Sequence, residues 1–224
     1  MSIHLDVLRQ VDLFTGLEKD DLAHIAAVAR DRHFERGEII LLEGELGGAL
    51  YVVYSGLVKV FKTSPEGKEQ VLRLIAPIHT FNDVPALDGG PNPASAAALE
   101  PTAVYALGHG DLQTLIAQYP GVASGAVRML ANALRHLVGL VETLSFRHVT
   151  ARVAKILLDQ EQLAHSGGTT HRLTQQEIAA MAGTAREMVG RALKELETAG
   201  AIELKQGRPI VLQPERLHLL AHDG

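Results

Sequence analysis

The chain has 224 residues, 46% of them hydrophobic and 21% charged, so it can bury the cores of one or two domains. Its net charge of −5 excludes a protein that is a polycation as a whole. Cysteine is absent, which excludes disulfides, zinc–thiolate sites, thiol redox sensing and an iron–sulfur cluster.

The charge is distributed unevenly along the chain. Residues 1–146 carry 11 Lys/Arg and 17 Asp/Glu, a net charge of −6, whereas residues 147–224 carry 10 and 9, a net charge of +1. Because an acidic segment repels polyanions, only the C-terminal part is expected to face DNA. The first residues lack the apolar core of a signal peptide, and no run of about 18 apolar residues could span a membrane. We therefore expect a soluble cytoplasmic protein with no membrane partner.

The N-terminal half changes from helical to strand-like patterning. Apolar residues recur at helical spacing over residues 5–30, and from Phe34 onward short apolar runs alternate with glycine. The stretch "SPEGKE" at 64–69 is typical of a hairpin turn between two such runs. These patterns predict a β-sandwich or barrel that is preceded by helices.

After about residue 110 the pattern is helical again and includes an apolar seam. Steps of three and four alternate for nearly three heptads through Val127, Leu130, Leu134, Leu137, Val141 and Leu144. Such a stripe packs either on the chain's own β-domain or against a second copy of the same helix. The narrow, regular stripe favours the second alternative, so we predict a parallel homodimer with these six residues in its interface.

The C-terminal segment is patterned as a winged helix-turn-helix. An amphipathic helix is predicted over 145–164, and a polar loop follows over 165–172. Two short helices around one glycine come next, and two apolar runs on either side of Gln206 and Gly207 predict a small hairpin. A helix, a turn with glycine, a second helix and a hairpin in this order indicate a DNA-binding module.

Capping residues define the two short helices. Thr174 and Glu177 match a capping box, and Gly183 ends the first helix where a positive φ is expected. The second helix is predicted from about Ala185 to Thr198. Its apolar side chains are expected to face inward: Met188, Val189, Ala192, Leu193 and Leu196.

The second short helix carries polar residues near its start. Arg186 and Glu187 are expected to face outward, with Arg191 about one turn later. Arginine can bind guanine O6 and N7 together, and glutamate can accept a hydrogen bond from cytosine N4. The alternative is a helical hairpin whose charges are only solvated. The polarity of the exposed first turn, where a recognition helix meets base edges, favours DNA binding.

The residues quoted above resemble the CRP/FNR family of bacterial transcription regulators over essentially the whole chain. "RGEIILLEGE" is similar to the start of that family's β-roll, and "TQQEIAAMAGTAREMVGRALKELETAGAI" is similar to its DNA-binding signature. The resemblance implies an α+β fold in three parts. These are a cyclic-nucleotide-binding-like β-roll (a jelly roll) with N-terminal helices at 1–120, a long dimerisation helix at 121–146 and a winged helix-turn-helix at 147–224.

The resemblance also implies a mechanism. A homodimer would bind a two-fold-symmetric double-stranded DNA site and recruit or block RNA polymerase. Arg186, Glu187 and Arg191 match the set that reads a TGTGA-like half-site in the cAMP-responsive branch of the family. The residues expected to contact phosphates are Thr174 and Thr184 around the first helix, and Arg208 with Lys205 in the wing.

The expected effector pocket departs from the family pattern. The Phe-Gly-Glu run of the cAMP-binding branch is Phe81, Asn82 and Asp83 here, followed by Val84. The Arg-Ser pair falls on Asn92 and Pro93, and the Thr-Ser pair of the long helix falls on Leu137 and Val138. A neutral Asn cannot replace the arginine that pairs with the cyclic phosphate, and Pro lacks the backbone N–H. Ordinary cAMP binding is therefore not expected.

Several alternatives stay open for the effector. Some relatives use haem to sense NO or CO, and His79 beside the pocket could ligate iron, although a surface loop histidine is the simpler interpretation. A third possibility is a regulator without an effector that is controlled by its abundance. The winged helix could also dock protein rather than DNA. No catalytic triad, carboxylate pair or phosphate-binding loop indicates an enzyme, and no metal site is expected.

Overall fold

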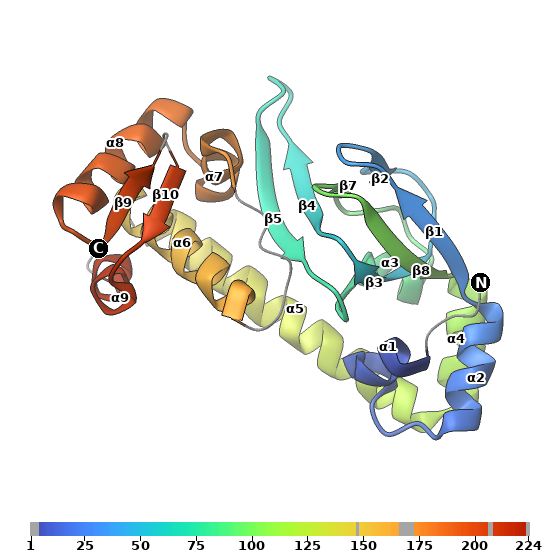
Figure 1. Cartoon of the computed structure of the whole chain (residues 1–224). Coiled ribbons are helices and arrows are strands. Elements are labelled where there is room, and N and C mark those ends of the chain that lie inside the picture. The colour runs from blue at the N-terminus through green and yellow to red at the C-terminus, as the bar shows by residue number, and fades with distance from the viewer. Residues whose placement is uncertain (1–4, 147, 166–172, 206–207, 223–224) are drawn as a thin grey trace. The chain divides into compact units, whose positions relative to one another are not determined.

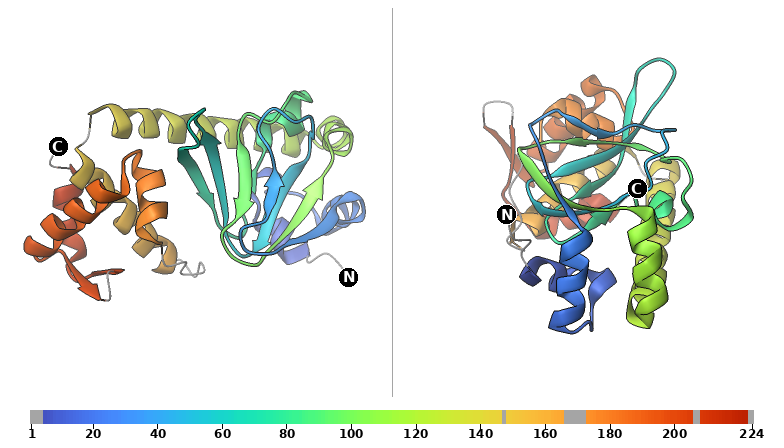
Figure 2. Two further views of the ribbon diagram at one scale, coloured as in Figure 1. Left: turned by 90° about the horizontal axis from the view of Figure 1, so that it is seen from above. Right: turned by 90° about the vertical axis from the view of Figure 1, so that its right-hand side faces the viewer.

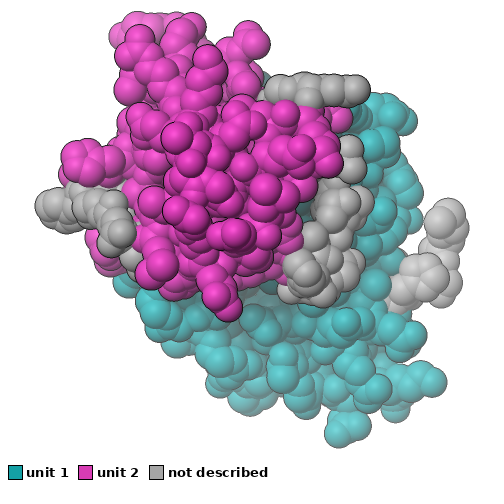
Figure 3. Space-filling model, turned by 60° about the vertical axis from the view of Figure 1, so that its left-hand side comes forward, with its two compact units in different colours: residues 1–62, 73–136 teal, residues 63–72, 137–224 magenta. Residues whose placement is uncertain are grey.

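The computed structural model describes residues 5–146, 148–165, 173–205 and 208–222 (Figure 1). The chain forms two compact units, one of residues 1–62 and 73–136 and the other of residues 63–72 and 137–224 (Figure 3). The mixed helix-and-strand class predicted from the sequence is confirmed. Within the described residues, no helix is both long and apolar enough to cross a membrane.

Two four-stranded antiparallel sheets form the β-roll (Figure 2). One sheet has the order β1-β8-β3-β6 and the other has the order β2-β7-β4-β5. The strands are β1 (Arg30–Phe34), β2 (Ile39–Leu41), β3 (Leu50–Ser55), β4 (Val58–Thr63), β5 (Glu69–Ile75), β6 (Thr80–Phe81), β7 (Ser95–Ala98) and β8 (Thr102–Leu107). Every residue of β7 and β8 is buried, so the weak strand propensity of the alanines in β7 is overridden by their central position.

The space between the sheets is filled by apolar side chains that alternate along the strands. Phe34, Val53, Ile75 and Val104 belong to this core, and Tyr51 packs against it. The predicted β-sandwich or barrel is therefore confirmed. The first strand, however, begins at Arg30 rather than at Phe34, because residues 30–34 pair in continuous antiparallel register with β8.

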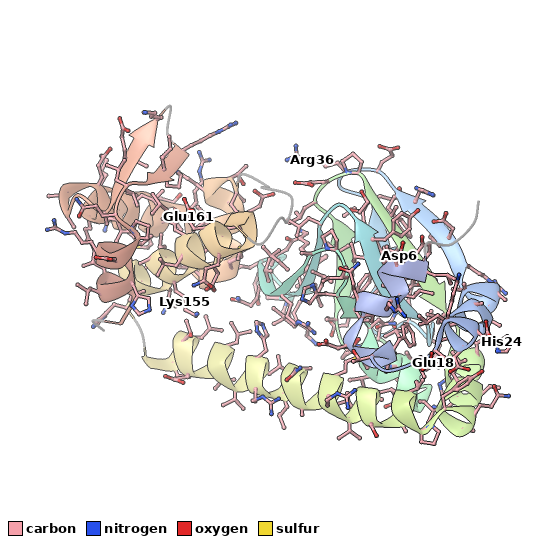
Figure 4. All side chains as sticks on the ribbon, turned by 60° about the horizontal axis from the view of Figure 1, so that its bottom comes forward. Asp6, Glu18, His24, Arg36, Lys155 and Glu161 are labelled. Atoms are coloured by element: carbon pink, nitrogen blue, oxygen red, sulfur yellow. The ribbon has the colours of Figure 1, made fainter. Side chains whose placement is uncertain are left out.

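Short helices pack on one end of the β-roll around a second core. They are α1 (Leu5–Gln10), a 3-10 turn η1 (Asp12–Phe14), α2 (Lys19–Val28), α3 (Asp83–Asp88) and α4 (His109–Gln118). Leu22 of α2 and Leu112 of α4 belong to the same buried cluster, and both helices project from the same end of the β-roll (Figure 2). Glu18, labelled in Figure 4, caps α2, and its backbone N–H donates to Asp21 Oδ2 at 3.3 Å.

The long helix α5 (Pro120–Phe146) has 27 residues and is continuous. It begins beside η1, where Val122, Ala126 and Met129 join the second core. Gly125 permits this close approach, because a Cβ there would meet the carbonyl oxygen of Leu13. The predicted helix after residue 110 is thus two helices, α4 and α5, with the break at Tyr119.

Four helices and a two-stranded hairpin form the described C-terminal module. They are α6 (Val149–His165), α7 (Gln175–Ala182), α8 (Arg186–Thr198), β9 (Ile202–Lys205), β10 (Arg208–Val211) and α9 (Pro214–His222). Apolar residues of α6, including Val153 and Leu157, are buried, as is Leu217 of α9. Lys155 and Glu161, labelled in Figure 4, are polar residues of α6, and Lys155 Nζ lies 3.4 Å from Asp159 Oδ1.

The predicted turns agree with the structure where it is described. At 64–69 the backbone N–H of Ser64 donates to Lys68 O at 2.9 Å, which closes the expected hairpin turn. The predicted polar loop at 165–172 lies outside the described residues apart from His165, which ends α6. Gln206 and Gly207, at the tip of the predicted wing, also lie outside them.

Gly125→Ala is expected to lower the free energy of unfolding by about 1–3 kcal/mol, because the added methyl must displace the backbone of η1. Urea denaturation followed by circular dichroism measures this change. Gly110→Ala in α4 is the matched control, since nothing lies within 4 Å of its added Cβ. The control should gain up to about 1 kcal/mol from helix propensity. Equal effects at both positions would contradict the close approach of η1 and α5.

Candidate nucleic-acid interface and effector cavity

Local interactions fix the start of α7 and the turn between α7 and α8. Thr174 Oγ1 accepts a hydrogen bond from the Glu177 backbone N–H at 3.2 Å, and Glu177 Oε2 accepts one from the Thr174 N–H at 2.6 Å. Gly183 has a φ of +61°, which glycine adopts without strain, and the Thr184 N–H donates to Ala179 O at 3.1 Å. The capping box and the positive φ predicted from the sequence are confirmed. The capping box fixes the start of α7, and Gly183 permits the turn into α8.

Helix α8 buries one apolar stripe within the C-terminal module. Val189, Ala192, Leu193 and Leu196 are at most 2% exposed. Met188 was predicted to face inward with them, but it is 38% exposed. It lies one residue before the first buried position, about 100° around the helix, so it falls at the margin of the stripe.

The polar residues at the two ends of α8 have different environments. Thr150 Oγ1 donates to Glu195 Oε2 at 2.5 Å, and the Leu204 backbone N–H donates to Glu197 Oε1 at 2.9 Å. These two carboxylates thus hold α8 to α6 and to the wing. Arg186, Glu187 and Arg191 are exposed, and none of their side chains has a partner among the residues that the structure describes.

The wing carries a further exposed cation beside α8. Lys205 of β9 and Arg208 of β10 are opposite each other in the antiparallel register. Lys205 Nζ lies 3.2 Å from Glu203 Oε2 at an exposed position, whereas the structure places no described partner on Arg208. The two predicted wing residues are therefore adjacent, and Arg208 carries the less compensated charge.

The first unit contains a cavity of about 220 Å³. Strand β5 contributes Arg73, the β5–β6 connection contributes His79, helix α3 contributes Asp83 and α5 contributes Asn132 and His136. Apolar side chains complete the lining: Val11, Leu13, Ile78, Met129 and Ala133.

Asp83 is the most deeply buried charged group of this cavity, at 7% exposure. Its Oδ2 lies 3.7 Å from Arg73 Nη1, which is too long for a hydrogen bond, and its Oδ1 has no hydrogen-bond partner. The Thr80 hydroxyl lies close by but donates to Met129 Sδ at 3.3 Å. Burial raises the pKa of Asp83, and the neighbouring Thr80 hydroxyl and Arg73 oppose this rise.

The residues predicted for the effector pocket do not gather around this cavity. Asp83 lines it, but Asn82 turns its side chain away and donates from Nδ2 to Ala49 O at 3.0 Å. Val84 is 47% exposed. Asn82 has a φ of +62°, so it adopts the left-handed conformation that glycine favours, which Asn tolerates better than most residues.

The remaining predicted pocket residues have other environments. Asn92 is buried and donates from Nδ2 to Leu42 O at 3.0 Å, and the Pro93 carbonyl accepts from Lys62 Nζ at 3.3 Å. Leu137 and Val138 are exposed on α5 and belong to the second unit. Arg73, Thr80 and His136 also line the cavity but were not predicted, because they come from three separate elements and no sequence motif marks them.

The cavity does not fit haem. His79 lines it, as the haem hypothesis requires, and its Nδ1 lies 3.0 Å from the Pro77 carbonyl oxygen. The volume of about 220 Å³ is nevertheless below the roughly 300–1,000 Å³ of pockets for drug-sized ligands, and haem is larger than most of these ligands. Among the described residues, no group of three or more His, Asp or Glu side chains is arranged to hold a metal ion.

The raised pKa of Asp83 predicts a specific pH dependence of stability. A carboxyl of the unfolded chain titrates near about 3.9. Between that value and the higher folded pKa, the folded protein binds more protons, so the free energy of unfolding falls as the pH rises. Asp83→Asn should therefore be more stable than the wild type at pH 7, and the difference should vanish below about pH 3.9.

Urea denaturation of the wild type and of Asp83→Asn across this pH range tests the prediction. Asp12→Asn is the control, because Asp12 also lines the cavity but is exposed. A wild type that is the more stable of the two at pH 7 would show that the Asp83 carboxylate is satisfied in the folded protein.

Comparisons with known proteins agree with this architecture. Residues 31–119 match the family model of the cyclic nucleotide-binding domain, and residues 151–220 match that of the Crp-like helix-turn-helix domain. The chain is 33% identical over 220 residues to the CRP-like cAMP-activated global transcriptional regulator of Mycobacterium tuberculosis, covering 95% of this chain and 97% of that protein. It is 35% identical over 209 residues to the cyclic AMP receptor protein of Thermus thermophilus, covering 93% and 96%.

Solved structures are also similar to this chain. The structure of FixK2 from Bradyrhizobium japonicum superposes with a TM-score of 0.77 at 28% identity, covering 88% of this chain and 99% of that chain. The catabolite activator protein of Thermus thermophilus has a TM-score of 0.55 at 35% identity, covering 94% and 98%. With its β-roll, long helix and winged helix-turn-helix, the chain belongs to the CRP/FNR family of DNA-binding transcription regulators.

Proposed function

We propose that the protein is a homodimer that reads a TGTGA-like palindrome through α8, and that ordinary cAMP does not control it. The observation that carries the proposal is the contrast along α8. Glu195 and Glu197 hold the fold, whereas Arg186, Glu187 and Arg191 are exposed without described partners. Charged side chains that the fold does not use are available to base edges.

The arrangement of α7 and α8 suits the major groove. A recognition helix contacts bases with residues near its N-terminus, which is where Arg186 and Glu187 lie. The backbone N–H groups of a helix N-terminus also favour a nearby phosphate. We assign three further residues to phosphate contacts: Thr174, which caps α7, Thr184 in the turn before α8, and Arg208 in the wing. On promoter DNA, the bound dimer would recruit or block RNA polymerase.

Arg186→Ala is expected to weaken binding to a TGTGA palindrome by about 5- to 150-fold, because one bidentate contact to guanine is worth roughly 1–3 kcal/mol. The variant should also discriminate less between the TGTGA palindrome and duplexes in which that guanine is replaced. Arg208→Ala is the contrast, since loss of a phosphate contact should weaken all sequences alike and reduce the salt slope by about one. Fluorescence anisotropy with labelled duplexes measures both. An Arg186→Ala variant that keeps its base preference would refute the assigned role.

The exposed seam of α5 supports a dimer. Val127, Leu134 and Val141 are 68%, 63% and 62% exposed, and Leu130 and Leu137 are 38% and 43% exposed. These large apolar side chains lie at the heptad positions that the sequence predicts, and the monomer leaves them in water. A second α5 that packs in parallel would cover them and would present two α8 helices about 34 Å apart, one turn of DNA.

Leu134→Glu is expected to shift the protein from dimer to monomer, because two-fold symmetry would place two carboxylates together in an apolar seam. Sedimentation velocity at micromolar concentration measures the change. Arg128→Glu is the matched control on the same helix, outside the seam. It should leave the dimer intact. A wild type that sediments as a monomer at all concentrations would contradict the proposed dimer.

The pocket residues argue against cAMP as the effector, although one relative is named a cAMP-activated regulator and another a cyclic AMP receptor protein. Asn92 is uncharged, and its Nδ2 already donates to Leu42 O. Asn82 places a side chain where the cAMP-binding branch has glycine, and that side chain is bonded to Ala49 O. Without the arginine, a cyclic phosphate would lose a charged hydrogen bond worth about 1.5–3 kcal/mol.

Isothermal titration with cAMP tests this part of the proposal. We expect no binding heat with cAMP at up to about 1 mM, because the site lacks its charged phosphate ligand. DNA affinity measured with and without the same cAMP concentration should be equal. Saturable micromolar binding of cAMP would contradict the proposal and leave the assignment of α8 unaffected.

A further inference from the structure

We propose that the cavity of the first unit binds a small zwitterion, an α-amino acid with an apolar side chain. The cavity is lined by a buried carboxyl group with one oxygen, Asp83 Oδ1, that has no hydrogen-bond partner, by an arginine that is only loosely paired, and by apolar side chains. Each of these three features corresponds to one part of such a ligand.

The carboxylate of Asp83 provides the first part of the site. Its side chain is 7% exposed, and Oδ1 has no hydrogen-bond partner. A buried ionised oxygen without a donor is costly, and structures that retain one commonly fill the gap with a ligand or an ion. An ammonium group would supply both the donor and the opposite charge.

Arg73 provides the second part. Its Nη1 lies 3.7 Å from Asp83 Oδ2, a distance at which the charges attract but no hydrogen bond forms. The guanidinium side chain is 28% exposed and can bind a carboxylate with two parallel hydrogen bonds. A zwitterion would thus replace one loose ion pair by two closer ones, at no cost in net charge.

The volume of the cavity and its apolar lining determine the third part of the site, which would hold the ligand's side chain. Val11, Leu13, Ile78, Met129 and Ala133 offer hydrocarbon to the ligand. A dry cavity of about 150 Å³ admits benzene, so about 220 Å³ suits a molecule of roughly nine heavy atoms such as leucine. A phosphate ester fits poorly, because the two carboxylates of Asp12 and Asp83 against the single Arg73 would repel its negative charge.

Titration calorimetry of the purified full-length protein tests the assignment with L-leucine, L-methionine and L-phenylalanine. Two analogues of leucine separate its charges: 3-methylbutylamine lacks the carboxylate, and 4-methylpentanoic acid lacks the ammonium group. At least one of the amino acids should bind with a millimolar or lower Kd, and both analogues should bind at least about tenfold more weakly than leucine.

Two variants identify the residues that hold each charge. Asp83→Asn should weaken leucine binding about 10- to 100-fold, and Arg73→Gln should do the same without weakening the amine analogue. Asp20→Asn removes the same charge from an exposed position on α2 and should leave binding unchanged. Urea denaturation of each variant shows that it is folded.

Three results would overturn the assignment. They are no binding of any of the three amino acids at about 10 mM, equal binding of leucine and one of its analogues, or unchanged binding by Asp83→Asn. The titration contains no DNA, so its outcome does not depend on whether the proposed reading of TGTGA is correct. The assignment of the ligand therefore does not rest on the proposed function.

Discussion

Burial of a single apolar stripe on α8 is the constraint on which the DNA-binding module depends. Val189, Leu193 and Leu196 are fully buried, and this burial determines which face of α8 is exposed to solvent. The capping box at Thr174 fixes the start of α7, and the left-handed Gly183 permits the turn from α7 into α8. Arg186 and Arg191 are consequently held on the exposed side of α8, where we propose that they contact bases.

The sensor half is organised by a different constraint, the satisfaction of buried polar groups. The side-chain amides of Asn82 and Asn92 donate to the backbone carbonyls of Ala49 and Leu42. These two side chains, which the sequence assigned to the effector pocket, therefore stabilise the β-roll. Two buried oxygens are exceptions among the described residues, because neither Asn92 Oδ1 nor Asp83 Oδ1 has a hydrogen-bond partner. Of these two residues only Asp83 lines the cavity, so our proposal is that a bound ligand supplies the donor that its Oδ1 lacks.

Features that depend on residues close together in the chain were predicted correctly from the sequence, whereas the cavity of the first unit was not. The capping box, the positive φ of Gly183 and the hairpin turn at 64–69 each depend on residues close in the chain, and each is confirmed. Met188 was assigned to the wrong face, because a residue at the margin of a helical stripe is not distinguished by periodicity alone. The cavity could not be predicted, because Arg73, Asp83 and Met129 meet only through the tertiary packing of β5, α3 and α5.

We propose above all that α8 reads base sequence and that it does not need cAMP to do so. Fluorescence anisotropy of the ligand-free protein should compare a TGTGA palindrome with a scrambled duplex of equal length across a salt series. The account predicts that the palindrome binds at least about 10³-fold more tightly, and that affinity for both duplexes falls steeply with salt. Equal affinity for the two duplexes at every salt concentration would contradict the claim, and affinity independent of salt would indicate that the winged helix does not engage the phosphate backbone at all.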